Sequence, residues 1–176
     1  MKAGEKDPMP RQDLAQELER LHPASFSWAL SCCRRDREEA EEVLQASYLK
    51  LLEGSARFDG RSSFKTFLFG VIRRTAAERR RRRAFQGRWL ELWGRAADRG
   101  AEPEEPNDSA ARLRRLDAAL ARLPRRQREV IELRLQHEMT IEAAAGALAI
   151  SVGSARVHYA RAKERLRRLL GEEEGP

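Results

Sequence analysis

Apolar residues in the first half of the chain recur at three- and four-residue intervals, which place them on one face of an α-helix. Residues 36–53 show this spacing, and Gly54 then provides a stop signal. A second such pattern begins at Phe64, where Ser62 or Ser63 can act as the N-cap. These patterns predict two amphipathic helices joined by a short loop rich in Gly, Ser and Arg.

The segment before residue 36 has the same helical period. Its leucines at positions 14, 18 and 21 and the apolar run 26–33 predict one or two helices, broken at Pro23. Strand signals are nearly absent throughout the chain, because β-branched residues are few and nowhere alternate with polar ones over a useful length. The first half is therefore predicted to be helical.

The second half repeats the helical pattern. Leucines at positions 113, 116, 120 and 123 share one face, and Pro124 ends that pattern. A helix is predicted over 125–136, and Thr140 can cap a short helix that precedes a long one over 152–170. The predicted core positions of the helix over 125–136 are Val130, Ile131, Leu133 and Leu135. The whole chain is therefore predicted to be all-α.

Between the two helical halves, residues 94–109 combine two prolines, two glycines and clustered acids without apolar periodicity. We expect a flexible acidic linker there, which serves either as a plain spacer or as a shield for the basic segments on both sides. The predicted fold is two small helical domains joined by this linker. The boundaries are 1–11 for a flexible N-terminus, 12–92 and 112–170 for the domains, 93–111 for the linker and 171–176 for an acidic tail.

Residues 140–161, TIEAAAGALAISVGSARVHYAR, have the form of a helix-turn-helix, whose second helix lies in the major groove of DNA. Ala145 is small where the two helices cross, and Ser151 can cap the second helix. The inward face of that helix is predicted to carry Ala155, Tyr159, Ala162, Leu166 and Leu169. The outward face offers Gly153, Arg156, Val157, Ala160 and Arg161, and arginine can bond guanine bidentately. An ordinary helical hairpin with a solvated basic face is the alternative.

Charge is unevenly distributed along the chain. The 176 residues contain 35 Lys and Arg against 28 Asp and Glu, which gives a net charge of +7. Residues 36–53 hold six acids against two bases, and 98–108 hold five acids against one, so each segment carries −4. Residues 57–83 hold ten bases against two acids, and 113–170 hold thirteen against six, which gives +8 and +7. Both halves therefore contain a basic segment suited to a polyanion such as nucleic acid.

Other classes of function find little support. No run approaches the roughly 18 apolar residues of a membrane span, and the acidic N-terminal segment does not suit a signal peptide, so we expect a cytoplasmic protein. The adjacent Cys32 and Cys33 suit small buried residues better than redox-active ones, a disulfide framework or a metal site. The three histidines are scattered and lack a plausible catalytic partner. We expect neither an enzyme nor a bound cofactor or metal.

Two stretches of the chain resemble extracytoplasmic-function (ECF) sigma factors of the sigma-70 superfamily. Upstream, DREEAEEVLQASYLKLLEG followed by RFDGRSSFKTFLFGVIRRTAAERRRR resembles region 2 of that family. Downstream, ALARLPRRQREVIELR and the block ISVGSARVHYARA resemble region 4. The likeness covers about residues 12–84 and 113–170. It implies a dissociable subunit of bacterial RNA polymerase that directs the enzyme to promoters.

The resemblance implies three binding surfaces. The acidic helix would dock on core RNA polymerase through Asp36, Glu39, Glu42 and Gln45. Region 4 would read the duplex −35 element through Ser154, Arg156, Val157, Ala160 and Arg161. Region 2 would recognise and melt the −10 element, and its loop over 54–63 matches the family loop that captures a flipped base. The expected −10 residues are Arg57, Arg61, Ser62, Lys65, Phe69, Arg73 and Arg74.

Within the −10 set, Phe69 is the predicted stacking partner for an unpaired base, because it falls off the apolar stripe that carries Phe64 and Phe67. Those two phenylalanines are assigned to the core. Phosphate contacts are expected from Lys65, Arg73 and Arg74, on the same side of the helix as Phe69. The arginine run 79–83 is expected to contact the DNA backbone without sequence preference.

Some positions depart from the family pattern. Phe67 stands where the family usually has Trp, Arg74 where Asn is common, and Ala149 where the turn usually has Gly. If residue 149 requires a positive φ, alanine costs about 1 kcal/mol there. Val157 and Ala160 replace polar or larger residues on the reading face, which suggests partial readout through thymine methyl groups.

The expected function is that of an ECF-type sigma factor that binds core RNA polymerase and directs promoter-specific initiation. The resemblance also implies an anti-sigma factor as a partner. Two alternatives stay open, a sigma-like decoy without initiation activity and a helix-turn-helix repressor. A decoy should have lost its basic surfaces, and a repressor leaves the acidic motif DREEAEEVLQ without a role.

Overall fold

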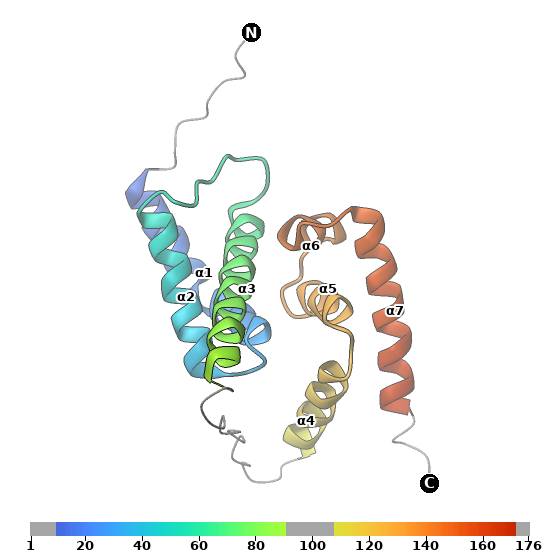
Figure 1. Ribbon diagram of the computed structural model, residues 1–176. Helices are drawn as coiled ribbons and strands as arrows, with labels where there is room; N and C mark the ends of the chain where they lie inside the picture. Colours follow the sequence, from blue (N-terminus) through green and yellow to red (C-terminus); the bar gives the residue numbers. More distant parts are fainter. Residues whose placement is uncertain (1–9, 91–107, 172–176) are drawn as a thin grey trace.

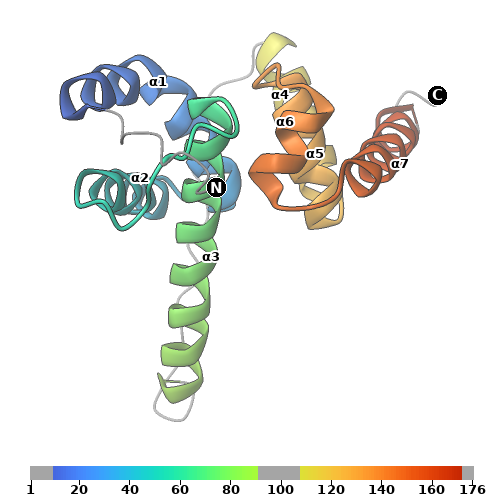
Figure 2. The same cartoon turned by 90° about the horizontal axis from the view of Figure 1, so that it is seen from above.

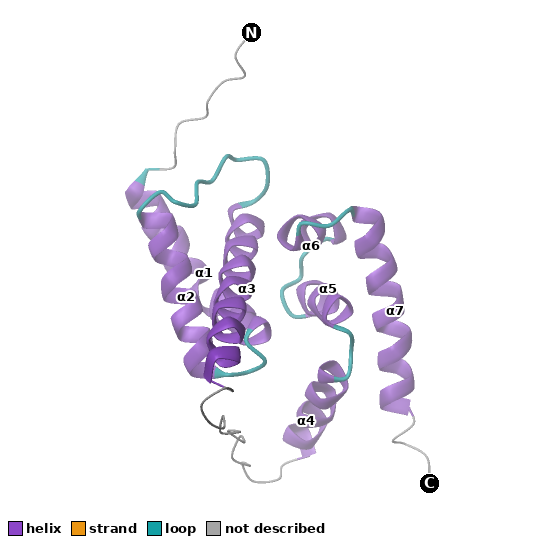
Figure 3. Ribbon diagram, in the orientation of Figure 1, coloured by secondary structure: helices purple, strands orange, loops and turns teal. Residues whose placement is uncertain are grey.

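The computed structural model describes residues 10–90 and 108–171, and every regular element in those two ranges is an α-helix (Figure 3). The prediction of an all-α chain is thus confirmed. The helices are α1 (Arg11–Cys32), α2 (Arg37–Leu52), α3 (Phe64–Leu90), α4 (Asp108–Ala121), α5 (Arg125–Leu135), α6 (Ile141–Leu148) and α7 (Val152–Gly171). Most of the predicted tails over 1–11 and 171–176 and most of the predicted linker over 93–111 lie outside the described residues, although α1 begins at Arg11, α4 at Asp108 and α7 ends at Gly171.

Helices α1, α2 and α3 form the first domain, in which each helix packs against the other two (Figure 1). The ends of these helices follow the sequence signals. The Asp36 carboxylate accepts the backbone N–H of Glu39 at the start of α2, and the Ser63 hydroxyl accepts that of Thr66 at the start of α3. Gly54 ends α2 with a φ of 75°, which a residue without a Cβ adopts readily.

Helix α1 continues through Pro23, so the predicted break there is wrong. An interior proline removes one helical hydrogen bond and costs about 3 kcal/mol. The helix is held on both sides of the proline by side chains buried against α2 and α3, among them Leu18, Leu21, Ser25 and Trp28. Burial of the apolar members of this set stabilises each by about 1.5–3 kcal/mol, which outweighs the local cost.

Helices α4 to α7 form the second domain. The Thr140 hydroxyl accepts the backbone N–H of Ala143 at the start of α6, as the sequence predicts. Val130, Ile131 and Leu133 of α5 are buried, but Leu135 is 61% exposed, so its assignment to the core is wrong. Leu135 is the last residue of α5. The helical spacing of apolar residues in the sequence includes this position, but the helix ends there and leaves its side chain exposed.

The two domains pack against each other along α3, which lies between α1 and α2 on one side and α5 and α6 on the other (Figure 2). One continuous apolar cluster includes Leu68 and Ile72 of α3 together with Val130 of α5 and Ala147 of α6. The backbones approach closely at Gly70, where a Cβ would lie 3.4 Å from the carbonyl oxygen of Ala147. The sequence predicts two domains but not this closed arrangement.

Candidate DNA- and polymerase-binding surfaces

The turn between α6 and α7 has the geometry of a helix-turn-helix. Ala149 ends α6 with a φ of 51°, so alanine occupies a left-handed position that favours glycine. The Ser151 hydroxyl then accepts the backbone N–H of Ser154 and begins α7. Ala145 is 1% exposed, as predicted for a crossing point between helices, and the N–H of Ile150 donates to its carbonyl.

The two faces of α7 divide as the sequence predicts. Ala155 and Ala162 are fully buried, Leu166 and Leu169 are buried, and Tyr159 is half-buried with the cations of Arg134 and Lys163 over its ring. The opposite face is exposed at every predicted reading position, namely Ser154, Arg156, Val157, Ala160 and Arg161. This face extends from the N-terminal end of α7, the end that a helix-turn-helix places in the major groove.

One reading residue has an internal partner. The guanidinium of Arg156 lies 3.2 Å from the carboxylate of Glu142 on α6, and both side chains are more than half exposed. Exposed ion pairs of this kind contribute about 0–1 kcal/mol. Breaking this ion pair would therefore cost little free energy and would free Arg156 to contact another group.

The acidic face of α2 is partly neutralised within the chain. Glu42 pairs with Arg79 and with Arg83, and Glu39 lies 3.3 Å from Arg83. Gln45 is exposed. The arginine run 79–83 in the second half of α3 is expected to contact DNA, but its members Arg79 and Arg83 pair with acids of α2. Sequence periodicity missed these pairs because they join residues about forty positions apart.

The loop between α2 and α3 exposes the basic residues predicted for the −10 element. Arg57 donates to the carbonyl of Gly54, and the side chain of Arg61 lies 3.3 Å from the carboxylate of Asp59. Ser62 is exposed. The loop is anchored from beneath, because Phe58 packs edge-on against Phe64 at a ring-centroid distance of 5.4 Å. The polar groups of the loop are thus exposed, while Phe58 packs against the aromatic side chains beneath it.

The face of α3 predicted to bind single-stranded DNA is covered by the second domain. Phe69 is fully buried, so the prediction of an available stacking ring is wrong for this arrangement. Its ring stacks on Trp28 at 5.8 Å and meets His137 edge-on at 4.9 Å. The ammonium of Lys65 donates to the carbonyl of His137 at 2.7 Å. Arg74 is exposed.

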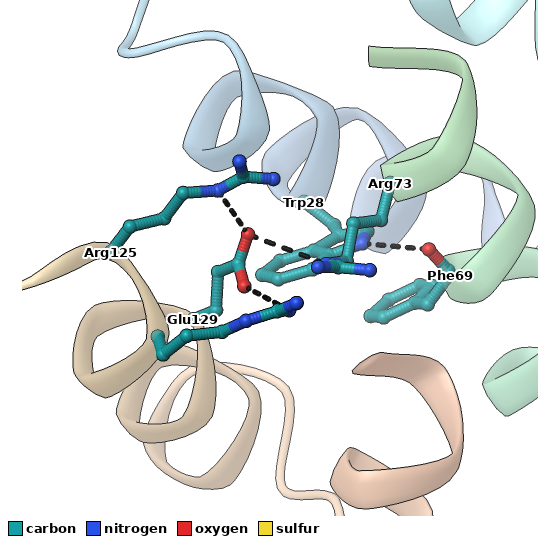
Figure 4. A network of polar contacts seen from close by, with 6 residues as sticks. Trp28, Phe69, Arg73, Arg125 and Glu129 are labelled. Atoms are coloured by element: carbon teal, nitrogen blue, oxygen red, sulfur yellow. Dashed lines mark hydrogen bonds and ion pairs between the residues drawn. The ribbon is translucent and has the colours of Figure 1, made fainter. Parts of the chain in front are cut away.

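A buried carboxylate stabilises the contact between α3 and the second domain. Glu129 of α5 is 5% exposed and lies within 3.4 Å of Arg73 from α3, and Arg125 and Arg126 of its own helix also bind it (Figure 4). Burial lowers the pKa of Arg73, and the charge of Glu129 opposes that shift. Beside the ion pairs, the indole N–H of Trp28 donates to the carbonyl of Phe69 at 3.0 Å (Figure 4).

His137 is a contact residue to which the sequence pattern assigns no role. Its side chain is 5% exposed and packs against Trp28 and Phe69. Burial, and then the positive charge of Lys65, lower its pKa to about 4. The one signal in the sequence for this second buried face was Phe69 itself, an aromatic residue off the main apolar stripe.

Comparisons with known proteins agree with both halves of the fold. Residues 18–86 match Sigma-70 region 2, and residues 113–166 match Sigma-70 region 4. The chain is 31% identical to the ECF RNA polymerase sigma factor SigX of Bacillus subtilis over 147 residues. The matched segment covers 79% of this chain and 76% of SigX. The chain belongs to the ECF sigma factors.

Further relatives of this ECF sigma factor span nearly its whole length. It is 28% identical over 161 residues to the RNA polymerase sigma factor CarQ of Myxococcus xanthus, covering 92% of this chain and 91% of CarQ. The sigma factor RpoE of Bartonella quintana, solved with the anti-sigma factor NepR, matches with a TM-score of 0.72 and 25% identity over 91% of this chain and 98% of RpoE. CnrH, solved with the cytosolic domain of CnrY, shares the fold with a TM-score of 0.66.

Sigma factors, the family to which this chain belongs, are initiation factors rather than enzymes. Within residues 10–90 and 108–171, no group of His, Cys, Asp or Glu is arranged to hold a metal ion. Nor does any helix of those ranges have the length and apolar character needed to cross a membrane. Burial raises the pKa of the Cys33 thiol to about 12, so this thiol stays protonated at neutral pH.

Proposed function

We propose that this ECF sigma factor binds core RNA polymerase in the cytoplasm and directs it to promoters with −35 and −10 elements. The observation that carries the proposal is the exposed face of α7, where Ser154, Arg156, Val157, Ala160 and Arg161 line one side of a recognition helix. This face is basic, has no buried partner and follows a turn with helix-turn-helix geometry.

Region 4 would read the −35 element as duplex DNA. Arg156 and Arg161 can each donate two hydrogen bonds to guanine, which discriminates by about 1–3 kcal/mol for each good pair. Ser154 and the N-terminal end of α7 would hold a phosphate. Val157 and Ala160 have only methyl groups to offer and would pack against thymine.

Region 2 would bind the −10 element after the two domains separate. The loop with Arg57, Arg61 and Ser62 is exposed already. Lys65, Phe69 and Arg73 are engaged by region 4, so they reach DNA only when α3 leaves α5 and α6. A freed Phe69 ring and freed cations would favour unpaired bases and their phosphates over the duplex.

Polymerase docking would use the face of α2 that carries Asp36, Glu39, Glu42 and Gln45. Glu39 and Glu42 would exchange Arg83 and Arg79 for basic groups on the polymerase. An anti-sigma factor is a further proposed partner, supported by the likeness to RpoE, which was solved with one. Such a partner would act by keeping the two regions together or by covering α2.

The test is run-off transcription with purified core RNA polymerase and a genomic fragment library. The wild-type chain should produce discrete transcripts, and the variant Arg156→Ala/Arg161→Ala should lose them while still binding the polymerase in a pull-down. Arg165→Ala/Arg167→Ala is the matched control, because it removes the same charge from the exposed C-terminal half of α7. Polymerase binding without any transcript from the wild-type chain would favour a decoy instead.

Docking is tested separately with Glu42→Gln and its matched control Arg79→Gln. Both variants break the same internal ion pair, but only Glu42→Gln removes a proposed docking group. We expect weaker polymerase binding for Glu42→Gln alone. Equal effects of the two variants would mean that the acid serves the fold and not the polymerase.

A further inference from the structure

A cleft rich in arginine lies where the two regions meet. Its volume is about 450 Å³, and its lining comes from the end of α1 and the turn after it in region 2, and from α4 and α5 in region 4. Arg34 and Arg35 line it from region 2, and Arg125 and Arg128 from region 4. An adjoining hollow of about 170 Å³ shares Arg34, Arg125 and Arg128 and adds Arg80 of α3.

The positive charge of this cleft exceeds what the chain neutralises. Arg35 pairs with Asp117 at 2.9 Å, and Arg125 pairs with the buried Glu129. The side chains of Arg34, Arg80 and Arg128 form no hydrogen bond or ion pair within the part of the chain that the structure describes, although Glu132 lies near Arg128 and Glu129 near Arg80. Burial, and then the nearby charge of Arg125, lower the pKa of Arg80. The arginines therefore repel one another until an anion joins them.

Two buried polar side chains also line the cleft. Ser31 is 6% exposed and Glu132 is 3% exposed, and the Ser31 hydroxyl interacts with the Glu132 carboxyl. Burial raises the pKa of Glu132 to about 7, so near neutral pH its carboxyl is protonated for much of the time and can donate a hydrogen bond. A carboxyl that is only partly ionised thus lies among five guanidinium groups and neutralises little of their charge.

The backbone adds two further features. Helix α5 begins at Arg125 without a side-chain cap, so the first N–H groups and the positive end of the helix dipole face the same region as the arginines. Arg34 and Arg35 both adopt positive φ values, 56° and 67°. Consecutive left-handed non-glycine residues are uncommon and occur where the surrounding structure fixes them, often at ligand sites.

We propose that this cleft binds a small anion with two linked phosphate groups, and that the bound anion holds regions 2 and 4 together. The cleft and the adjoining hollow share Arg34, Arg125 and Arg128, so one phosphate group can occupy each of them while the shared arginines contact both groups. Inorganic pyrophosphate and nucleoside diphosphates share the required chemistry. The binding site depends only on the geometry of the cleft, whereas its effect on transcription rests on the proposed function.

Isothermal titration calorimetry of the full chain with pyrophosphate tests the site directly, in magnesium-free buffer at constant ionic strength. We expect saturable binding at one site and much weaker binding of inorganic phosphate. A parallel titration with ADP distinguishes the sources, because a nucleotide site would bind ADP more tightly than pyrophosphate. The variant Arg34→Gln/Arg128→Gln should bind pyrophosphate about tenfold more weakly or worse, since hydrogen bonds to charged groups are lost.

The control is Arg165→Gln/Arg167→Gln, which removes equal charge from exposed positions of α7. Circular dichroism should show both variants folded. A binding isotherm that does not saturate, or an equal loss of pyrophosphate affinity in the two variants, would overturn the proposal. If a DNA duplex displaces pyrophosphate from both the wild-type chain and the control, at matched phosphate concentration, the cleft binds DNA and the pyrophosphate proposal is wrong.

The proposed cleft and the proposed sigma function can fail separately. Pyrophosphate binding without any run-off transcription would contradict only the sigma function. Transcription without pyrophosphate binding would contradict only the anion-binding cleft.

Discussion

The two helices of this sigma factor that are proposed to face DNA differ in what covers them. The predicted reading face of α7 is exposed at all five positions, and the ion pair of Arg156 with Glu142 lies at the surface. The predicted DNA face of α3 has Phe69 fully buried and Arg73 paired with a buried carboxylate. Both faces carry arginine and suit DNA by charge, so residue type alone does not tell them apart.

Under the proposed function, the difference means that access to the two promoter elements is governed separately. Region 4 would meet duplex DNA as it stands, whereas region 2 would first exchange its contacts with region 4 for contacts with DNA. The covering contacts are specific ones, a buried ion pair and an aromatic group of three rings. Single substitutions should therefore act very differently on the two faces.

The largest expected effect is on the covered face. Trp28→Ala should lower the free energy of unfolding by about 3–5 kcal/mol, because it leaves a cavity beneath Phe69 and removes a buried hydrogen bond. Val157→Ala on the exposed face should change it by less than about 0.5 kcal/mol. Urea unfolding followed by circular dichroism measures both values. Similar losses of unfolding free energy in the two variants would contradict the proposed difference between the two faces.

A pH dependence of up to about 3 kcal/mol is expected from His137. Its folded pKa of about 4 lies below the unfolded value of 6.5, so its contribution is fully present above pH 6.5 and is lost as the pH falls through 4. Glu132 acts in the opposite direction, because its folded pKa of about 7 lies above 4.5 and its contribution is lost as the pH rises through 7.

The two groups can be separated by substitution. In a Glu132→Gln background, the stability of the chain should fall between pH 6.5 and pH 4, and adding His137→Gln should flatten that fall. Urea unfolding at several pH values provides the measurement. An unchanged slope after His137→Gln would place the titrating group elsewhere.

The smallest effect concerns the turn that positions the exposed face. Ala149→Gly should raise the free energy of unfolding by about 1 kcal/mol, because glycine adopts a φ of 51° without a Cβ clash. Ala118→Gly, within α4 and exposed, is the control and should lower it by about 0.5–1 kcal/mol. Thermal unfolding compares the two, and destabilisation by Ala149→Gly would show that residue 149 is not left-handed in solution.

The sequence predicts local structure well because its signals are local. Ser63, Thr140 and Ser151 each cap the helix that follows, and the inward and outward faces of α7 follow from its period. Pro23 misled the prediction because tertiary packing overrode a backbone preference.

The contact between the regions was beyond such reasoning. It joins Lys65 and Phe69 to His137, about seventy residues away, and no periodic pattern connects them. The expected roles of Phe69 and Arg73 therefore came from charge and position on a single helix, without the second domain that covers them. The same limit concealed the pairing of Glu42 with Arg79.

A reversible disulfide across the contact tests the central claim, that region 2 must leave region 4 before it can open DNA. An added Cβ at Gly146 would lie 3.2 Å from the Cγ2 methyl of Thr66, a position that a cysteine sulfur at residue 66 can occupy. The two sulfurs of a disulfide are about 2.05 Å apart, so cysteines at residues 66 and 146 can be joined. The native thiols of Cys32 and Cys33 have raised pKa values through burial and should not compete.

The measurement is run-off transcription by core polymerase with the variant Thr66→Cys/Gly146→Cys, oxidised and then reduced. The oxidised chain should bind −35 duplex DNA as the reduced chain does but give no transcript, and reduction should restore transcription. Equal transcription from the oxidised and the reduced chain would contradict the account.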